Sequence, residues 1–139
     1  MKVYYIFKMK KEFVNLYKDT PSILYHILKN IYYMDKDSVE YGYHLFNQLI
    51  QTFNKTGLDR DLYIRMHQDI PYTKVRDVHE IRNQYKEEYS KLMINHFYIR
   101  LEIDQDYSSF YSYLMDKEKD LFVCNFKNTD FFFLEEKNL

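Results

Sequence analysis

The sequence of 139 residues contains no tryptophan and no alanine, and it has only two glycines, two prolines and one cysteine. Phosphate-binding motifs such as GxGxxG and the P-loop need several glycines, because the backbone must approach the phosphate closely, so both motifs are excluded. The nucleophile elbow GxSxG is also absent. A lone cysteine cannot form an internal disulfide, which excludes the framework of a small secreted protein. The scarcity of glycine and proline argues against long flexible linkers.

The chain also has no surplus of positive charge and no long hydrophobic run. Lysine and arginine total 20 against 21 aspartates and glutamates, so the formal net charge is −1. This balance argues against a protein whose main task is to bind phosphate backbones. The apolar run Val3–Phe7 is too short for a signal peptide or a membrane span. We therefore expect a soluble, cytoplasmic protein with a single domain over residues 1–139 and no membrane partner.

Aromatic residues, in contrast, are abundant: 16 tyrosines and 11 phenylalanines make 19% of the chain aromatic. An AT-rich coding genome favours Lys, Asn, Tyr, Ile and Phe over Ala, so this bias alone indicates no function. Tyrosine nevertheless combines a large apolar ring with a polar tip, and it suits half-buried and interface positions.

Hydrophobic spacing predicts an α+β protein, in which about five helices pack on a small mixed sheet of about four strands. The expected strands are 2–8, 96–103, 121–126 and 131–135, the last two joined by the turn 127–130 into a C-terminal β-hairpin. The expected helices are 10–18, a segment that starts at Thr20-Pro21, 37–53, 77–93 and a segment capped by Asp106. Residues 54–76 are the least periodic and are predicted to form a loop, with at most a short element at 62–66.

The same spacing predicts which helical side chains face the core. Around the helix 10–18 the apolar stripe consists of Met9, Phe13, Leu16 and Tyr17. In the helix 37–53 the expected inward residues are Val39, Tyr43, Phe46, Leu49, Ile50 and Phe53. Its opposite face, which includes Gln48 and Gln51, is expected to be solvated or to contact a partner.

No pattern of reactive side chains predicts an enzyme or a metal site. The five histidines form no HxxxH pair, and Asp104-Gln105-Asp106 is better explained by a strand end and a helix cap than by a cation. Cys124 lies in an apolar strand pattern, where a buried thiol behaves as a small hydrophobe. We therefore expect no catalytic residue, no metal and no cofactor, and an enzyme centred on Cys124 is the least favoured alternative.

The stretch Lys8-Met9-Lys10-Lys11, followed by Phe13 and Tyr17, comes nearest to the mixture of basic and aromatic residues typical of nucleic-acid binding. Phe13 and Tyr17 are four residues apart, so both rings lie on one face of a helix. Periodicity alone favours packing against the core for these rings, and contact with a partner is the alternative.

Several segments resemble one family of proteins, the sporulation inhibitors of replication (SirA). The resemblance spans nearly the whole chain, and its N-terminal motif is the specific part. The family consists of small intracellular α/β proteins that bind the N-terminal domain of the replication initiator DnaA and restrain initiation at the origin. The segments that carry the resemblance are Tyr4-Tyr5, Lys11-Glu12-Phe13-Val14-Asn15 with Tyr17, Met66-His67-Gln68, and Leu121–Phe126 leading to Leu134.

The resemblance implies a non-enzymatic inhibitor of replication initiation that occludes an interaction surface of DnaA and contacts no nucleic acid directly. In the family, the aromatic pair that matches Phe13 and Tyr17 lies on the helix that contacts the initiator, so these two rings are implied to be partner-binding. A second contact helix corresponds to residues 38–53, whose polar face includes Gln48 and Gln51. The alternative function is a nucleic-acid-binding regulator that uses exposed aromatic residues together with Lys8, Lys10 and Lys11.

Overall fold

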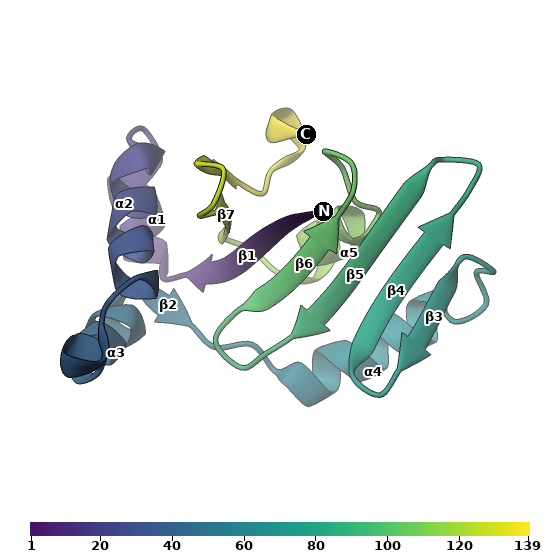
Figure 1. Cartoon of the computed structure of the whole chain (residues 1–139), viewed down its shortest axis with the longest axis horizontal. Helices are drawn as coiled ribbons and strands as arrows, with labels where there is room; N and C mark the ends of the chain where they lie inside the picture. Colours follow the sequence, from purple (N-terminus) through teal and green to yellow (C-terminus); the bar gives the residue numbers. More distant parts are fainter.

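Eight strands of the described chain pair into one antiparallel sheet with helices on both of its faces (Figure 1). The computed structural model describes residues 1–139, apart from the side chain of Lys36. The helices are α1 (Lys11–Tyr17), α2 (Pro21–Tyr32), α3 (Val39–Leu49), α4 (Lys55–Met66) and α5 (Phe110–Lys117), with short 3₁₀ turns at Lys36–Ser38 and Glu136–Asn138.

The sheet has the strand order β3-β4-β5-β6-β1-β7-β8, and the short β2 also pairs with β1. β1 pairs with β6 on one side and with β7 on the other. Its sequence is apolar on both faces, which suits a strand in the interior of a sheet. The predicted strand at residues 2–8 is therefore confirmed, and it lies in the interior of the sheet. The strands are β1 (Lys2–Met9), β2 (Ile50–Gln51), β3 (Tyr72–Val75), β4 (Val78–Asn83), β5 (Glu88–Ile94), β6 (Ile99–Ile103), β7 (Leu121–Asn125) and β8 (Asp130–Phe133).

The two faces of the sheet build two separate hydrophobic cores. β1 contributes to both, because successive side chains of a strand point to opposite faces. Tyr4 and Ile6 lie in one core, and Phe7 and Met9 lie in the other. The first, here the α4–α5 core, also includes Leu58, Leu62, Leu92, Leu101, Phe110, Tyr111 and Leu114. The second, here the α1–α3 core, also includes Leu24, Tyr25, Leu28, Leu49, Phe122, Cys124 and Phe126.

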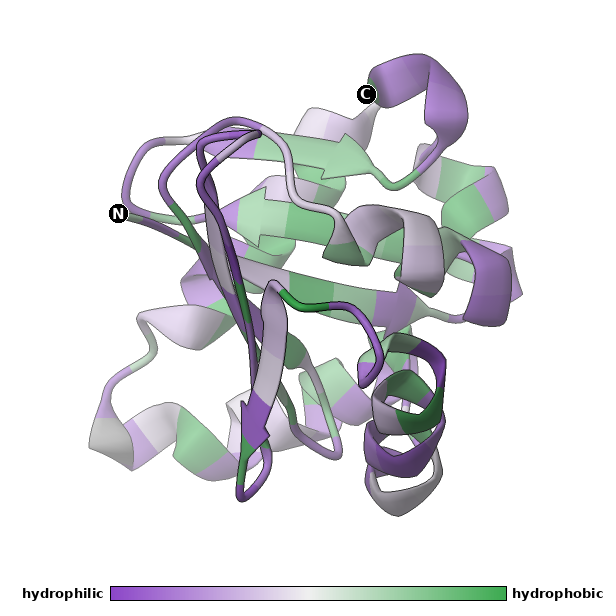
Figure 2. Ribbon diagram, turned by 90° about the vertical axis from the view of Figure 1, so that its right-hand side faces the viewer, coloured by the Kyte–Doolittle hydropathy of each residue, from purple (hydrophilic) through white to green (hydrophobic). Residues whose placement is uncertain are grey.

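The helices cover the two faces unequally. Figure 1 shows α4 and α5 behind the sheet, whereas α1, α2 and α3 gather at one end of it. Figure 2, viewed from the right-hand side of Figure 1, shows the nearest helix on one side only of the nearest strands. Along β5 and β6, buried residues alternate with half-buried ones, as in strands with one solvated face. Within the described chain, the front of β3 to β6 in Figure 1 is therefore an open face.

The predicted small mixed sheet of about four strands is wrong, although the class remains α+β. The main cause is the segment 77–93, which was predicted to be a helix and is the hairpin of β4 and β5. Its first residues have the spacing of a helix capping box, but His79 and Ile81 are buried while their neighbours are not, which is the period of a strand.

The turn of this hairpin lacks the usual sequence signal for a β-turn, which explains why the hairpin was not predicted. Asn83 stabilises this turn in the absence of a glycine. Its Oδ1 accepts hydrogen bonds from the backbone N–H groups of Tyr85 (3.1 Å) and Lys86 (3.2 Å). Glu87 then adopts a φ of 50°, in the left-handed region that glycine usually occupies. The chain thus reverses direction without glycine.

The predicted loop 54–76 is also wrong, because it contains α4 and β3. Asn54 caps α4, and its side chain accepts a hydrogen bond from the Gly57 N–H at 3.1 Å. Only Leu58 and Leu62 of this helix are buried. A single pair four residues apart is too narrow a stripe to stand out as helical periodicity.

Four predicted helices and the predicted C-terminal hairpin are confirmed, although some helical side chains that were expected to face inward do not. The helices α1, α2, α3 and α5 and the C-terminal hairpin of β7 and β8 occur where they were expected. Leu16, Val39 and Tyr43 were expected to face the core, but they are 63%, 55% and 51% exposed. Met9 belongs to β1 rather than to the stripe of α1, and Phe53 lies beyond the end of α3.

Candidate functional site

The start of α1 lies beside the end of α3, although the two are far apart in the sequence. The Lys10 N–H, just before α1, donates a hydrogen bond to the carbonyl of Leu49, the last residue of α3, at 2.9 Å. Gln51 pairs with Lys8 across β1 and β2, and its Nε2 donates to the Met9 carbonyl at 3.4 Å. The fold therefore brings the polar end of α3 next to the helix that carries the aromatic pair.

Phe13 and Tyr17 are both half-buried, and both pack against the α1–α3 core. None of the residues of α1 is fully buried. The two rings are therefore neither free on the surface nor sealed in the core. One side of each ring packs inward, and the remainder is available to a partner.

Leu16, which was predicted to face the core, lies on this surface instead. It is 63% exposed and lies three residues after Phe13, so the two side chains are neighbours on α1. An exposed leucine beside two half-buried aromatic rings is a common feature of protein-binding surfaces. No local signal in the sequence marks this exposure, because Leu16 falls on the same apolar stripe as Phe13 and Tyr17.

Gln48 and Gln51 are exposed, as the polar face of the predicted helix required. Gln48 lies in the last turn of α3, whereas Gln51 lies in β2. Both side chains can donate and accept hydrogen bonds. We refer to Phe13, Leu16, Tyr17, Gln48 and Gln51 together as the α1 patch.

The basic residues next to the α1 patch are partly neutralised. Lys8 forms an ion pair with Glu118, in which both side chains are mostly buried. The Nζ of Lys11 lies 3.7 Å from the Asp120 carboxylate. These pairs reduce the positive potential that the alternative function, phosphate binding by this stretch, would need.

Cys124 offers no reactive thiol. It is fully buried in β7, and burial raises the pKa of its thiol well above the usual range, with Asp130 adding to the effect. A thiol with a raised pKa is a poor nucleophile. Among the described residues, no group of three or more His, Cys, Asp or Glu side chains is placed to hold a metal ion.

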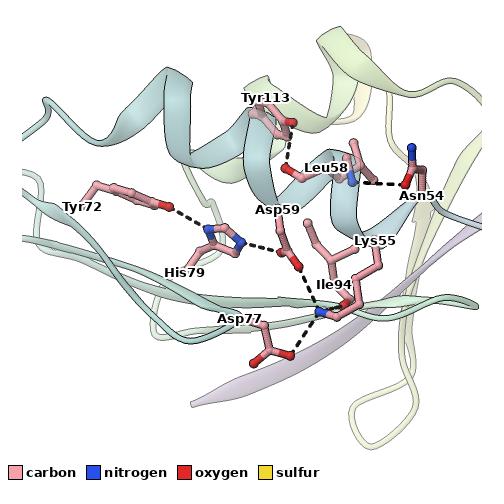
Figure 3. A network of polar contacts seen from close by, with 10 residues as sticks. Asn54, Lys55, Leu58, Asp59, Tyr72, Asp77, His79, Ile94 and Tyr113 are labelled. Carbon is pink, nitrogen blue, oxygen red and sulfur yellow. Dashed lines mark hydrogen bonds and ion pairs between the residues drawn. The ribbon is translucent and has the colours of Figure 1, made fainter.

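One buried polar network joins α4 to the sheet (Figure 3). His79 is fully buried; its Nδ1 lies 2.7 Å from the Tyr72 hydroxyl and its Nε2 lies 2.7 Å from Asp59 Oδ1. A neutral ring satisfies both contacts, if the Tyr72 O–H donates to Nδ1 and the Nε2–H donates to the carboxylate. Burial lowers the pKa of His79, and the hydrogen bond to Asp59 opposes that effect.

Lys55 extends the network to the β3–β4 turn. Its Nζ donates to Asp59 at 3.0 Å, to Asp77 at 3.1 Å and to the Ile94 carbonyl at 2.7 Å. Burial lowers the pKa of Lys55, but the hydrogen bonds to the two carboxylates outweigh it and leave the pKa raised. Every member of this network has a partner within the fold, so it fastens α4 rather than binding a substrate.

Comparison with protein families identifies a matching family model. A family model described as "Sporulation inhibitor of replication protein SirA" matches residues 2–137. No curated protein matches the sequence. Among the described helices, none has the length and apolar character needed to cross a membrane.

Proposed function

Because the chain belongs to the family of sporulation inhibitors of replication, SirA, over residues 2–137, we propose that it binds the N-terminal domain of the replication initiator DnaA. The family consists of regulatory inhibitors, and an inhibitor of replication implies a protein partner in replication initiation. In this proposal the protein acts without catalysis, by occluding the surface through which the initiator contacts itself or other replication proteins. The proposal places it in the cytoplasm of a bacterial cell.

The observation that carries this proposal is the composition of the α1 patch. Phe13 and Tyr17 expose part of each ring, Leu16 adds 63% of its surface, and two exposed glutamines lie at the neighbouring end of α3. Aromatic and aliphatic side chains anchor protein interfaces when they fill pockets of the partner, and polar side chains at the rim fix the orientation. Occlusion of this kind needs only shape and hydrogen bonding, and no cofactor.

The alternative of a nucleic-acid-binding regulator is less well supported. Lys8 and Lys11 already have carboxylate partners, so their release toward phosphate would cost part of their binding energy. Salt dependence separates the two functions, since nucleic-acid affinity falls steeply with salt and an aromatic contact changes little. We expect no binding to origin DNA at physiological salt.

The test is a calorimetric titration with the purified N-terminal domain of DnaA. We expect Leu16→Asp to weaken binding by about tenfold or more, because a buried unpaired carboxylate costs more than 1 kcal/mol at an interface. Ile70→Asp is the matched control, since Ile70 is 96% exposed and lies between α4 and β3, outside the α1 patch. Equal affinities of the two variants, or no binding by the wild-type protein, would contradict the proposal.

A further inference from the structure

The two edge strands of the sheet, β3 and β8, are protected in different ways. An unpaired edge is a template for another strand, and proteins commonly guard it with charged side chains, lysine above all. β3 carries the exposed Lys74, and the exposed Arg76 follows it. β8 has neither lysine nor proline, and its only charged residue is Asp130, at its start. The β8 edge is therefore the less protected of the two.

The backbone of β8 directs hydrogen-bonding groups to its outer side. In an antiparallel pair, successive residues point their N–H and C=O groups alternately toward the neighbouring strand and away from it. The Leu134 N–H donates to the Leu121 carbonyl at 2.9 Å, so Leu134 points toward β7, and Phe132, two residues earlier, does the same. Phe131 and Phe133 therefore direct their backbone groups away from β7, toward the open edge.

The C-terminal turn covers one of these outward groups. Asn138, at the end of the 3₁₀ turn Glu136–Asn138, donates a hydrogen bond from its Nδ2 to the Phe133 carbonyl at 2.7 Å. Figure 2 shows this turn folded back over the outermost strand at the top of the sheet. Within the described chain, no other side chain hydrogen-bonds to the backbone of β8. Because the turn is exposed, its contact competes with water and can open locally.

The sequence of β8 is complementary to a second copy of itself. The outward groups of Phe131 and Phe133 pair with each other when two β8 strands lie antiparallel about Phe132. In this register Phe132 lies opposite the same residue of the second copy, and cross-strand aromatic pairs of this kind stabilise a sheet. Asp130 lies opposite Leu134 of the second copy, so no like charges meet. All three rings are only half-buried, so each has surface left for such a contact.

We propose that β8 is the pairing edge of a reversible homodimer and that the C-terminal turn keeps this edge closed. When Asn138 releases the Phe133 carbonyl, the β8 strands of two copies pair antiparallel and join the two sheets into one. Pairing through strands of four residues buries little surface, so the dimer dissociates readily. This dimer needs only the chain itself and does not depend on binding of the initiator by the α1 patch.

Sedimentation velocity over a series of protein concentrations measures the dimerisation. Asn138→Ala removes the donor that closes the edge and leaves β8 itself intact. Because two such hydrogen bonds must open for each dimer, this variant is expected to dimerise about tenfold or more tightly than the wild-type protein. Asn128→Ala is the matched control, since Asn128 is exposed on the turn before β8, and it should behave as the wild-type protein does. Equal dimerisation of the wild-type protein and Asn138→Ala, or no dimer of either, would overturn the proposal.

A disulfide tests the register of the pairing. Opposite residues of a non-hydrogen-bonded antiparallel pair have Cα atoms about 4.5 Å apart, within the reach of a disulfide. Phe132→Cys, combined with Asn138→Ala, should therefore form a covalent dimer under mild oxidation, which a non-reducing gel detects. Asp130→Cys in the same background is the control, because it is more exposed but its counterpart lies four residues along the strand, roughly 13 Å away. The native Cys124 is buried and should not cross-link.

Two outcomes of the cross-linking would reject pairing through β8. One is cross-linking through Asp130→Cys as fast as through Phe132→Cys. The other is a Phe132→Cys variant that melts as a folded protein and dimerises, but forms no disulfide. Because Asn138→Ala leaves the packing of β8 unchanged, the sedimentation result decides whether the turn closes the edge even where Phe132→Cys unfolds the chain.

Discussion

The two cores of this protein differ in how completely they are closed. On the α4–α5 side, helix α5 buries Phe110, Tyr111, Tyr113 and Leu114, and the hydrogen-bonded network around His79 fastens α4 to the sheet. On the α1–α3 side, helix α1 buries none of its residues fully, and Leu16 is 63% exposed. Both sides contain many aromatic rings, so composition alone does not distinguish them.

This difference indicates that the two sides have different roles, one in stabilising the fold and the other in binding. A domain of this size is only marginally stable, so it needs at least one face whose packing is complete. The α4–α5 core supplies that face. The α1–α3 side can then keep half-buried rings such as those of Phe13 and Tyr17. Transfer of their exposed parts from water to the surface of a partner costs little free energy. The α1 patch lies on this less closed side.

The largest effect is expected from a truncation in the closed core. Leu62→Ala removes a fully buried side chain of α4 and should lower the free energy of unfolding by about 3 kcal/mol through the cavity that it leaves. Ile64→Ala is the control on the same helix, because Ile64 is 57% exposed, and it should change stability by about 0.5 kcal/mol or less. Urea unfolding measures both. A similar loss in the two variants would mean that α4 does not seal this core.

The α1 patch should respond in binding more than in stability. Phe13→Ala and Tyr17→Ala should each cost about 2 kcal/mol of affinity for the N-terminal domain of DnaA, roughly thirtyfold. Because both rings are half-buried, each truncation should also lower stability, by about 1 kcal/mol. Calorimetric titration and thermal melting on the same variants separate the two effects, with Tyr85→Ala, at a fully exposed turn, as control. Large destabilisation with unchanged affinity of the folded fraction would make these rings core residues.

The network around His79 should make the closed side sensitive to acid. The pKa of His79 is lowered in the folded protein by burial, whereas in the unfolded chain it is near 6.5. As the pH falls through that value the unfolded state takes up a proton and the folded state does not, so the free energy of unfolding decreases. The groups that face the ring are Asp59 and Lys55 of α4 and Lys74 and Tyr72 of β3.

The measurement is the free energy of unfolding between about pH 7.5 and about pH 5.5, the range in which an unperturbed histidine titrates. The wild-type protein should lose stability toward the lower pH. His79→Gln should be less stable at the higher pH, because Asp59 and Tyr72 lose a partner, but its stability should change less with pH. Parallel profiles for the two proteins would assign the acid sensitivity to other groups.

The elements of the α1–α3 side were predicted better from the sequence than those of the α4–α5 side, although the α4–α5 core is the more completely closed. β1, α1, α2, α3 and the β7–β8 hairpin could be predicted because each has strong periodicity or a recognisable start such as Thr20-Pro21. The α4–β5 segment could not, since α4 buries only Leu58 and Leu62, and the β4–β5 turn uses Asn83 and Glu87 in place of glycine. A four-strand sheet was the consequence of losing β2, β3, β4 and β5 from the prediction.

Local periodicity could predict which residues of the α1 patch share a helix face, but not how exposed each of them is. Periodicity predicts that Phe13 and Tyr17 lie on one face of a helix. Their assignment to partner binding rests only on the resemblance to SirA. The exposure of Leu16 depends on how far α2 and the sheet extend beneath α1, which is a tertiary property that no local pattern records. The contact between Lys10 and Leu49, which joins α1 to the end of α3, is likewise non-local.

The smallest effect is expected at the edge of the α1 patch, where Lys11 lies on the exposed side of α1. Its side chain is 72% exposed and its Nζ is 3.7 Å from Asp120, and an exposed pair of this kind contributes about 0–1 kcal/mol to stability. Lys11→Gln should therefore leave melting unchanged. In binding, a charge at the rim of an aromatic contact mainly steers the encounter, so the association rate should fall while the dissociation rate stays the same. The rate difference from the wild-type protein should vanish at high salt, because screening removes the steering. Lys86→Gln, on the β4–β5 turn, is the control for a general change in net charge. Stopped-flow kinetics with the initiator domain measure both rates. A faster dissociation of the Lys11→Gln complex would mean that this lysine is buried against a carboxylate of the partner, and that the α1 patch binds through charge as much as through its rings.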